Sequence, residues 1–208
     1  AEDNFSFFKL EARLNYQPIN ALNISFSPEL ESRLSKTQYV TQVDFSNSKR
    51  NILGTIDNQT LSASFRINYT INPNLTIQYY AQPFISRGRY TDFKYVTNAT
   101  ADRLNDRFYA FNSLEIELNN GSFEIDENSD GVLDYSFSNP DFSYVQFNSN
   151  LVMRWEYIPG SELFLVWSQG TRANISTSEG LVDGFQTGIL NQQPQNIFLI
   201  KATYRFIL

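Results

Sequence analysis

The sequence predicts an antiparallel all-β fold and, more specifically, a transmembrane β-barrel. One hairpin motif occurs three times in the 208 residues: a tyrosine, five turn-forming residues, a leucine and two further apolar residues in alternation. The copies begin at Tyr16, Tyr69 and Tyr157, and apolar residues also alternate before each tyrosine. A period of two on both sides of a short Pro, Asn or Gly turn is typical of a β-hairpin. Repeated hairpins with an aromatic residue at each turn are the pattern of membrane barrels.

Seven strands are predicted from this alternation, and three short turns join six of them in pairs. The strands lie near residues 5–16, 22–29, 61–69, 75–82, 153–157, 163–167 and 198–208. The turns lie at residues 17–21, 70–74 and 158–162. A weaker pair of segments, near residues 108–118 and 122–137, would raise the count to nine. Both counts are odd.

Each predicted strand has one apolar and one polar face. Before Tyr69, for example, Phe65 and Ile67 alternate with Arg66 and Asn68. A soluble antiparallel sheet alternates in the same way, with the apolar face toward its core, so the alternation alone leaves both architectures open. Three features favour the barrel: short turns alternate with long connections, the apolar stretches have about the nine to eleven residues that a tilted strand needs to span a bilayer, and Tyr and Trp residues lie at the hairpin ends. The predicted aromatic girdle comprises Tyr16, Tyr69, Trp155 and Tyr157.

The long connections are residues 32–57, 87–141 and 170–195, which are rich in Asn, Ser, Thr, Asp and Gly. This composition is typical of extracellular loops, and we expect the connections to be such loops, which carry most of the function in barrels. Within the second connection, apolar residues alternate with Glu115 and Glu117. This alternation predicts a hairpin that rises above the membrane.

The final segment alternates up to the last residue of the chain, and its apolar face ends in Tyr204, Phe206 and Leu208. This aromatic ending resembles the C-terminal signal of bacterial outer-membrane barrels, which the barrel-assembly machinery reads. Single-chain bacterial barrels have an even number of strands, whereas the count here is odd. We therefore expect residues 1–208 to be the C-terminal part of a larger outer-membrane barrel. Its partners would be membrane lipid and the remaining strands, supplied by the same protein upstream or by other envelope proteins.

The composition excludes several classes of function. A formal net charge of −6 does not provide the basic surface that nucleic-acid binding requires. The chain has no Cys and no His, which excludes disulfides, thiol nucleophiles and histidine general bases. No catalytic residues are predicted. Glu115 and Glu117, at i and i+2 on one strand, are more typical of a solvent or lumen face than of the carboxylate pair of a glycoside hydrolase.

One segment has the spacing of a calcium loop, in which oxygen ligands at positions 1, 3, 5 and 7 and a glycine at position 6 surround the cation. Gly131 occupies position 6, but Phe137 stands where an EF-hand has its closing glutamate. Two alternatives remain: a loop that calcium stiffens, and an acidic turn without metal. The predicted ligands are Asp126, Asn128, Asp130, Val132 and Asp134.

Several stretches, in order, resemble one family of Bacteroidetes outer-membrane proteins. They include Tyr79-Tyr-Ala-Gln-Pro-Phe84, Asn139-Pro-Asp-Phe142, residues 150–157 and 159–169, and the ending at residues 198–206. In that family a family-9-like carbohydrate-binding domain precedes a C-terminal domain of uncharacterised function. The resemblance implies an outer-membrane barrel that takes part in glycan binding or uptake, although the carbohydrate-binding domain lies outside this chain. The alternative from another class is a soluble, secreted all-β carbohydrate-binding module.

Overall fold

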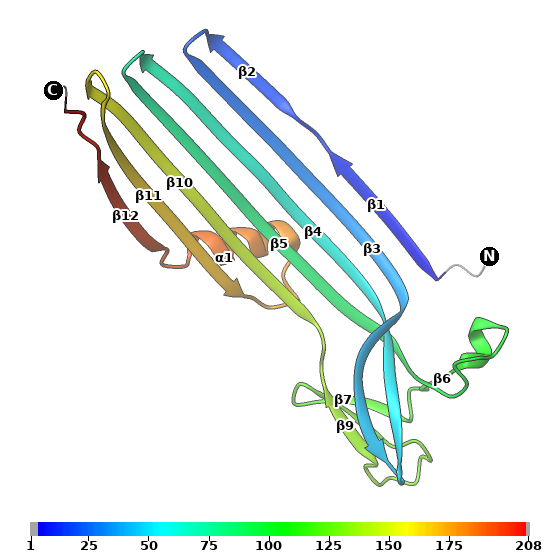
Figure 1. The fold of residues 1–208 in the computed structure, drawn as a ribbon. Helices are drawn as coiled ribbons and strands as arrows, with labels where there is room; N and C mark the ends of the chain where they lie inside the picture. The colour runs from blue at the N-terminus through cyan, green and yellow to red at the C-terminus, as the bar shows by residue number, and fades with distance from the viewer. Residues whose placement is uncertain (1–3, 207–208) are drawn as a thin grey trace. The chain divides into compact units, whose positions relative to one another are not determined.

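A computed structural model describes residues 4–206, and 68% of the structure is strand. The strands form two antiparallel sheets, and one short helix, α1 (Leu181–Leu190), follows the last hairpin (Figure 1). The predicted antiparallel all-β class is therefore confirmed. Among the described residues no helix is long and apolar enough to cross a membrane.

The larger sheet has nine strands arranged over seven positions. Its path runs β1 (Phe5–Glu11), β3 (Leu22–Phe45), β4 (Ser48–Asn72), β5 (Leu75–Val96), β10 (Phe142–Ile158), β11 (Ser161–Asn174) and β12 (Gln195–Ala202). Two short strands lie off this path: β2 (Leu14–Ile19) pairs with β3, and β6 (Phe108–Ala110) pairs with β5. The seven positions match the seven predicted strands. No pairing among residues 4–206 joins the β12 edge to the β1 edge, so the sheet is open and no closed barrel is formed.

The three predicted hairpins are confirmed, with tighter turns than expected. Only two residues separate β2 from β3, β4 from β5, and β10 from β11. In the last of these turns Gly160 has a φ of +79°, a conformation that a residue without a Cβ adopts at no steric cost.

The predicted long loops are partly wrong. Residues 32–57 are mostly strand, because β3 and β4 continue toward each other and meet at Ser46 and Asn47, which both have positive φ as a tight hairpin turn requires. β5 extends to Val96, and β11 extends to Asn174. Polar side chains on both faces of these extensions conceal the alternation on which the prediction depended.

The prediction that the weaker pair of segments, near residues 108–118 and 122–137, adds two strands to the barrel is wrong. The 3-10 helix η1 (Leu104–Arg107) precedes this region, which forms the second sheet apart from the short β6. That sheet comprises β7 (Ile116–Asn119), β8 (Ser122–Ile125) and β9 (Tyr135–Ser138), in that order. The hairpin predicted around Glu117 is confirmed, since Glu117 pairs with Glu124 across β7 and β8.

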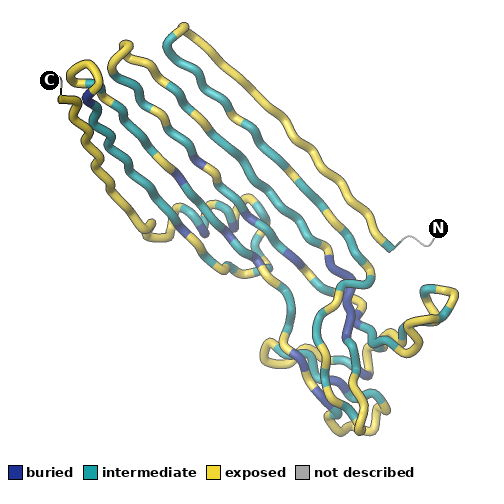
Figure 2. The backbone as a smooth tube through the Cα atoms, in the orientation of Figure 1, coloured by how far each residue is buried: buried dark blue, intermediate teal, exposed yellow. Residues whose placement is uncertain are grey.

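The chain divides into two compact units. The first comprises Ala1–Phe8, Ser32–Asn58 and Gly88–Phe142, and the second comprises Lys9–Glu31, Gln59–Arg87 and Ser143–Leu208. The first unit has an aromatic core in which Phe93 contacts Phe123 and Phe137, with ring centroids 4.4 and 5.3 Å apart. The second unit contains the three short turns and α1. Figure 2 shows that β12, at the edge of the sheet, is exposed along its whole length.

The C-terminal strand is shorter than predicted. β12 ends at Ala202, and Thr203 continues the pairing through two backbone hydrogen bonds with Glu162 (2.8 and 3.1 Å). Tyr204 and Phe206 follow outside the strand, and Leu208, the third residue of the predicted assembly signal, lies outside the described residues.

Candidate functional site

One face of β10, β11 and β12 carries a band of apolar side chains in the second unit. The strand register places directly opposed residues on the same face, in three successive rows. We call these rows the apolar band: Leu151, Trp167 and Phe198; Met153, Leu165 and Ile200; Trp155, Leu163 and Ala202. Phe198 and Ile200 are 73% and 71% exposed, and Trp155 is 45% exposed. A soluble domain rarely leaves so large a continuous apolar surface uncovered.

A row of polar side chains ends the band on one side. The next row on the same face contains Ser149, Gln169 and Asn196. Asn196 Oδ1 accepts hydrogen bonds from the Trp167 indole N–H (2.9 Å) and from Gln169 Nε2 (3.0 Å). An indole with an apolar body and a hydrogen-bonded N–H is the arrangement found where hydrocarbon meets a polar layer.

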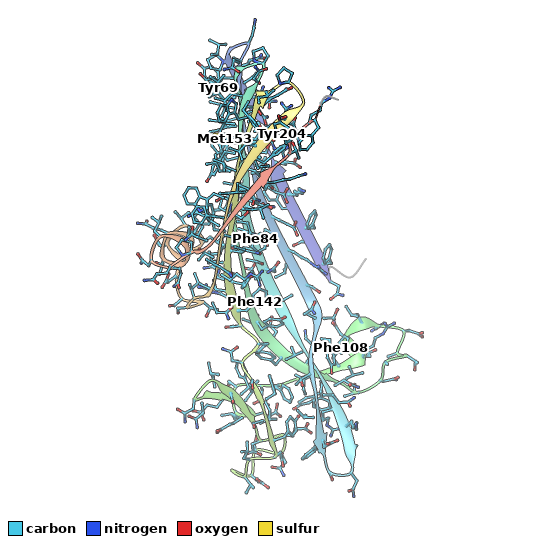
Figure 3. The ribbon with its side chains drawn as sticks, turned by 60° about the vertical axis from the view of Figure 1, so that its left-hand side comes forward. Tyr69, Phe84, Phe108, Phe142, Met153 and Tyr204 are labelled. Carbon is cyan, nitrogen blue, oxygen red and sulfur yellow. The ribbon has the colours of Figure 1, made fainter. Side chains whose placement is uncertain are left out.

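Aromatic residues end the band on the other side. Trp155 lies edge-on to Tyr157, with ring centroids 6.0 Å apart, and the Tyr157 hydroxyl donates a hydrogen bond to the Thr203 carbonyl (3.1 Å). Tyr69, Met153 and Tyr204 lie toward the end of the sheet that carries the short turns (Figure 3). The four predicted girdle residues, Tyr16, Tyr69, Trp155 and Tyr157, are all exposed. Their position fits a girdle, and the role itself stays a prediction.

We call the opposite face of the same strands the polar face, because it carries Arg154, Glu156, Asn150 and Ser168; it also carries one apolar row, Val152, Val166 and Leu199. Arg154 forms an ion pair with Glu162 (Nε to Oε1, 2.9 Å), and its guanidinium also approaches Glu156 at 3.6 Å. On the neighbouring hairpin, Arg66 stacks over Tyr80 at 5.1 Å from the ring centroid.

Near the start of β12 lies a solvent-open groove of about 570 Å³, which is lined by residues from both faces of the sheet, including Asn148, Gly170 and Arg172 of the polar face. We call this space the polar groove. Its lining residues are Asn148, Ser149, Asn150, Ser168, Gln169, Gly170, Thr171, Arg172, Gln192, Gln193, Gln195 and Ile197.

The helix α1 packs on the same face as the apolar band, beyond the polar row. Val145, which shares this face with Leu151 because the register between them has no shift, lies under Gly188. A Cβ at Gly188 would stand 2.7 Å from the Val145 side chain, and one at Gly184 would stand 2.4 Å from Ile175. Glycine at i and i+4 therefore allows the helix backbone to approach the sheet closely. Sequence reasoning missed α1 because glycine disfavours helix, although the Gly180, Gly184, Gly188 spacing was visible.

The comparison with known families returns one match, to a model described as a domain of unknown function, DUF5916, which covers residues 1–207. The chain belongs to the DUF5916 family. No curated protein and no solved structure matches it.

In the acidic loop of this DUF5916 domain, the side-chain oxygens accept hydrogen bonds from the backbone N–H groups of the loop itself. The Asp126 carboxylate accepts hydrogen bonds from the Asp130 N–H (3.1 Å) and the Gly131 N–H (2.7 Å). Asp134 accepts from the Glu127 N–H (2.9 Å). Over residues 4–206 no group of three or more Asp, Glu, His or Cys side chains is arranged to hold a metal ion. The spacing of the residues along the sequence fits a calcium loop, whereas the carboxylates are not gathered around one point in the structure. The calcium site stays a prediction.

We expect weak calcium binding, on the order of 0.1–1 mM, if the loop turns its oxygens to a cation, because the closing glutamate is missing. Calcium would protect residues 126–134 from proteolysis. Limited proteolysis across a calcium titration measures this, with Asp126→Ala plus Asp130→Ala as the control. Equal cleavage at several millimolar calcium, or equal protection of the double variant, would favour the metal-free acidic turn.

The first unit contains a half-buried ionic cluster that the sequence did not indicate. Arg50 donates two hydrogen bonds to Glu127 (3.0 and 3.2 Å) and stacks over Tyr95 at 4.5 Å from the ring centroid. The Tyr135 hydroxyl also donates to Glu127, and burial together with this hydrogen bond raises the pKa of Tyr135 far above its ordinary value. Arg50 lies in a strand and Glu127 in the acidic loop, so this ion pair ties that loop to the strand.

Glu115 and Glu117 do not act as a pair in this DUF5916 domain. Glu115 is 5% exposed and accepts hydrogen bonds from the Tyr109 hydroxyl and the Asn112 N–H, whereas Glu117 is exposed on β7. Both carboxylate oxygens of the buried Glu115 are therefore hydrogen-bonded. The expectation that the chain has no catalytic residues stays a prediction.

Proposed function

We propose that this DUF5916 domain is the C-terminal part of an outer-membrane β-barrel, in which the apolar band faces lipid and the polar face lines the lumen. The observation that carries the proposal is the exposed apolar band bounded on one side by a hydrogen-bonded polar row and on the other by Tyr and Trp. Lipid-facing strands of a barrel have this succession of polar, apolar and aromatic residues. A soluble sheet would bury such a face against a core.

The lengths of the strands support the same proposal. β3, β4 and β5 have 24, 25 and 22 residues, whereas a tilted strand needs only about nine to eleven to cross a bilayer. The surplus belongs to the first unit, whose exposed polar turns and small sheet fit the aqueous side of the membrane. We assign the long connections to the cell exterior and the short turns to the periplasm.

The two edges of the open sheet imply further partners. An unpaired strand edge cannot remain in hydrocarbon, because each unsatisfied backbone group there costs several kcal/mol. Strands of the same protein upstream of this chain, or of another envelope protein, would pair with the β1 and β12 edges. The barrel-assembly machinery would insert the protein, and the aromatic residues after β12 would serve as its signal.

We further propose a part in glycan binding or uptake at the cell surface. The support is the resemblance to Bacteroidetes outer-membrane proteins that carry a family-9-like carbohydrate-binding domain. The polar groove, which is lined mainly by amide and hydroxyl side chains, supplies independent support.

A detergent test distinguishes the barrel from a soluble carbohydrate-binding module. We expect the purified protein to stay in solution only above the critical micelle concentration of a detergent, because the apolar band would otherwise aggregate. Analytical ultracentrifugation before and after detergent removal measures this. A monodisperse protein without detergent would contradict the proposal and support the soluble module.

A further inference from the structure

The polar groove is formed by three strands and one connection, all in the second unit. The register places Asn148 opposite Gly170, and Asn150 opposite Ser168, on the polar face. The segment between α1 and β12 brings Gln192 and Gln193 to the same space. At about 570 Å³ the groove lies within the range of ligand-binding sites, which is roughly 300–1,000 Å³.

Packing does not require a glycine at position 170, which lies in the floor of the groove. A Cβ at Gly170 would meet only the Asn148 side-chain oxygen, at an ordinary contact distance of 3.5 Å. Gly170 contrasts in this respect with Gly184 and Gly188, where a Cβ would collide with neighbouring side chains. The missing side chain therefore leaves space open between Asn148 and the facing strand.

The lining offers many hydrogen-bonding groups that the protein does not use. Ser168 donates to Asn150 Oδ1 (2.6 Å), which leaves the Asn150 amide hydrogens available. Within residues 4–206, the side chains of Asn148, Gln192 and Gln193 make no hydrogen bond to the protein. A carboxamide carries a donor and an acceptor side by side, which complements neighbouring hydroxyl groups that can each donate and accept.

Arg172 is the one ionisable side chain among the lining residues, and it forms no ion pair with any described residue. No carboxylate lines the groove, although the whole chain has a net charge of −6. A guanidinium pairs with a carboxylate through two parallel hydrogen bonds, and such charge-assisted bonds are about twice as strong as neutral ones. The groove thus combines one carboxylate-binding group with a set of hydroxyl-binding amides.

We propose that the polar groove binds an acidic saccharide, with its carboxylate on Arg172 and its hydroxyls on the amides of Asn148, Gln192 and Gln193. The inference deepens the proposed glycan role and rests on it for the assignment of this face to the lumen. The site would then select uronate-containing glycans as they pass along the barrel wall.

The test uses the complete protein, purified in detergent and also inserted into phosphatidylcholine vesicles. Digalacturonate is titrated by calorimetry against its dimethyl ester, which has the same shape without the charge. We expect the acid to bind about tenfold more tightly than the ester. Arg172→Gln should remove that preference, and Asn148→Leu should weaken binding of both ligands. Arg66→Gln changes an arginine on the same polar face outside the groove, and it should leave the preference intact.

Three results would overturn the proposal: no binding of digalacturonate, equal affinity for acid and ester, or full competition by equimolar inorganic phosphate, which would indicate an unspecific anion site. Vesicle insertion is measured on the same samples. If the protein inserts but does not bind digalacturonate, only the proposal for the groove is contradicted. If the protein does not insert, the barrel proposal is contradicted. In that case the titration in detergent still decides whether the groove binds the saccharide.

Discussion

Replacing Leu165 with arginine should destabilise the protein in a lipid bilayer by about 2–4 kcal/mol. Leu165 lies in the middle row of the apolar band, opposite Met153 on β10 and Ile200 on β12. Arginine there would place a charge in hydrocarbon, where neither water nor an acidic partner is within reach on that face. The measurement is urea unfolding of the protein in vesicles, followed by tryptophan fluorescence.

The matched control is Val166→Arg, one residue along the same strand. Val166 lies on the opposite face, opposite Val152 and Leu199, which the proposal assigns to the lumen. Because the lumen of a barrel is polar, this change should cost much less than Leu165→Arg. Equal losses from the two changes would show that the faces are wrongly assigned.

Replacing both Tyr204 and Phe206 with serine should prevent most of the protein from reaching the outer membrane. These residues follow β12, which ends at Ala202, so the double change leaves the paired strand intact while it removes the aromatic ending. Without the signal the chain should remain in the periplasm and be degraded. Quantitative immunoblotting of outer-membrane fractions measures the effect.

Arg205→Ser provides the control for this experiment. Arg205 lies between the two aromatic residues, donates its backbone N–H to Ser161 Oγ (3.0 Å), and packs its side chain against Gly160. The control keeps the backbone bond and both aromatic rings, so we expect near-normal levels in the outer membrane. Normal levels of the Tyr204 and Phe206 double variant would refute the assembly role of the aromatic ending.

The hairpins could be predicted from the sequence because each depends on local information. Alternation around Tyr69 and Tyr157 and a turn containing Pro, Asn or Gly determine both the strand and its partner. The hairpin at Glu117 followed from the same rule. The order of the seven main strands in the sheet is also predictable, because each lies beside the next of these strands along the chain.

The parts that the sequence did not predict either have a weak local signal or depend on contacts between distant residues. Residues 32–57 continue as strands because they pair with each other, even though their polar composition is typical of loops. The helix α1 forms although it contains two internal glycines, because those glycines let it pack on Val145 and Ile175. The polar groove combines residues near 148 and 170, which the strand register brings together, with Gln192 from the connection between α1 and β12.

Quenching of the two tryptophans by brominated lipid tests the lipid-facing assignment most directly. Trp155 and Trp167 are the only tryptophans of the chain, and they occupy the last and the first row of the apolar band, respectively. Trp155→Phe and Trp167→Phe variants allow each to be measured alone. We predict that both are quenched, more strongly by bromine near the lipid carbonyls than near the chain ends, because each lies at a boundary of the band. Fluorescence that brominated lipid leaves unchanged, in protein that co-sediments with the vesicles, would contradict the account.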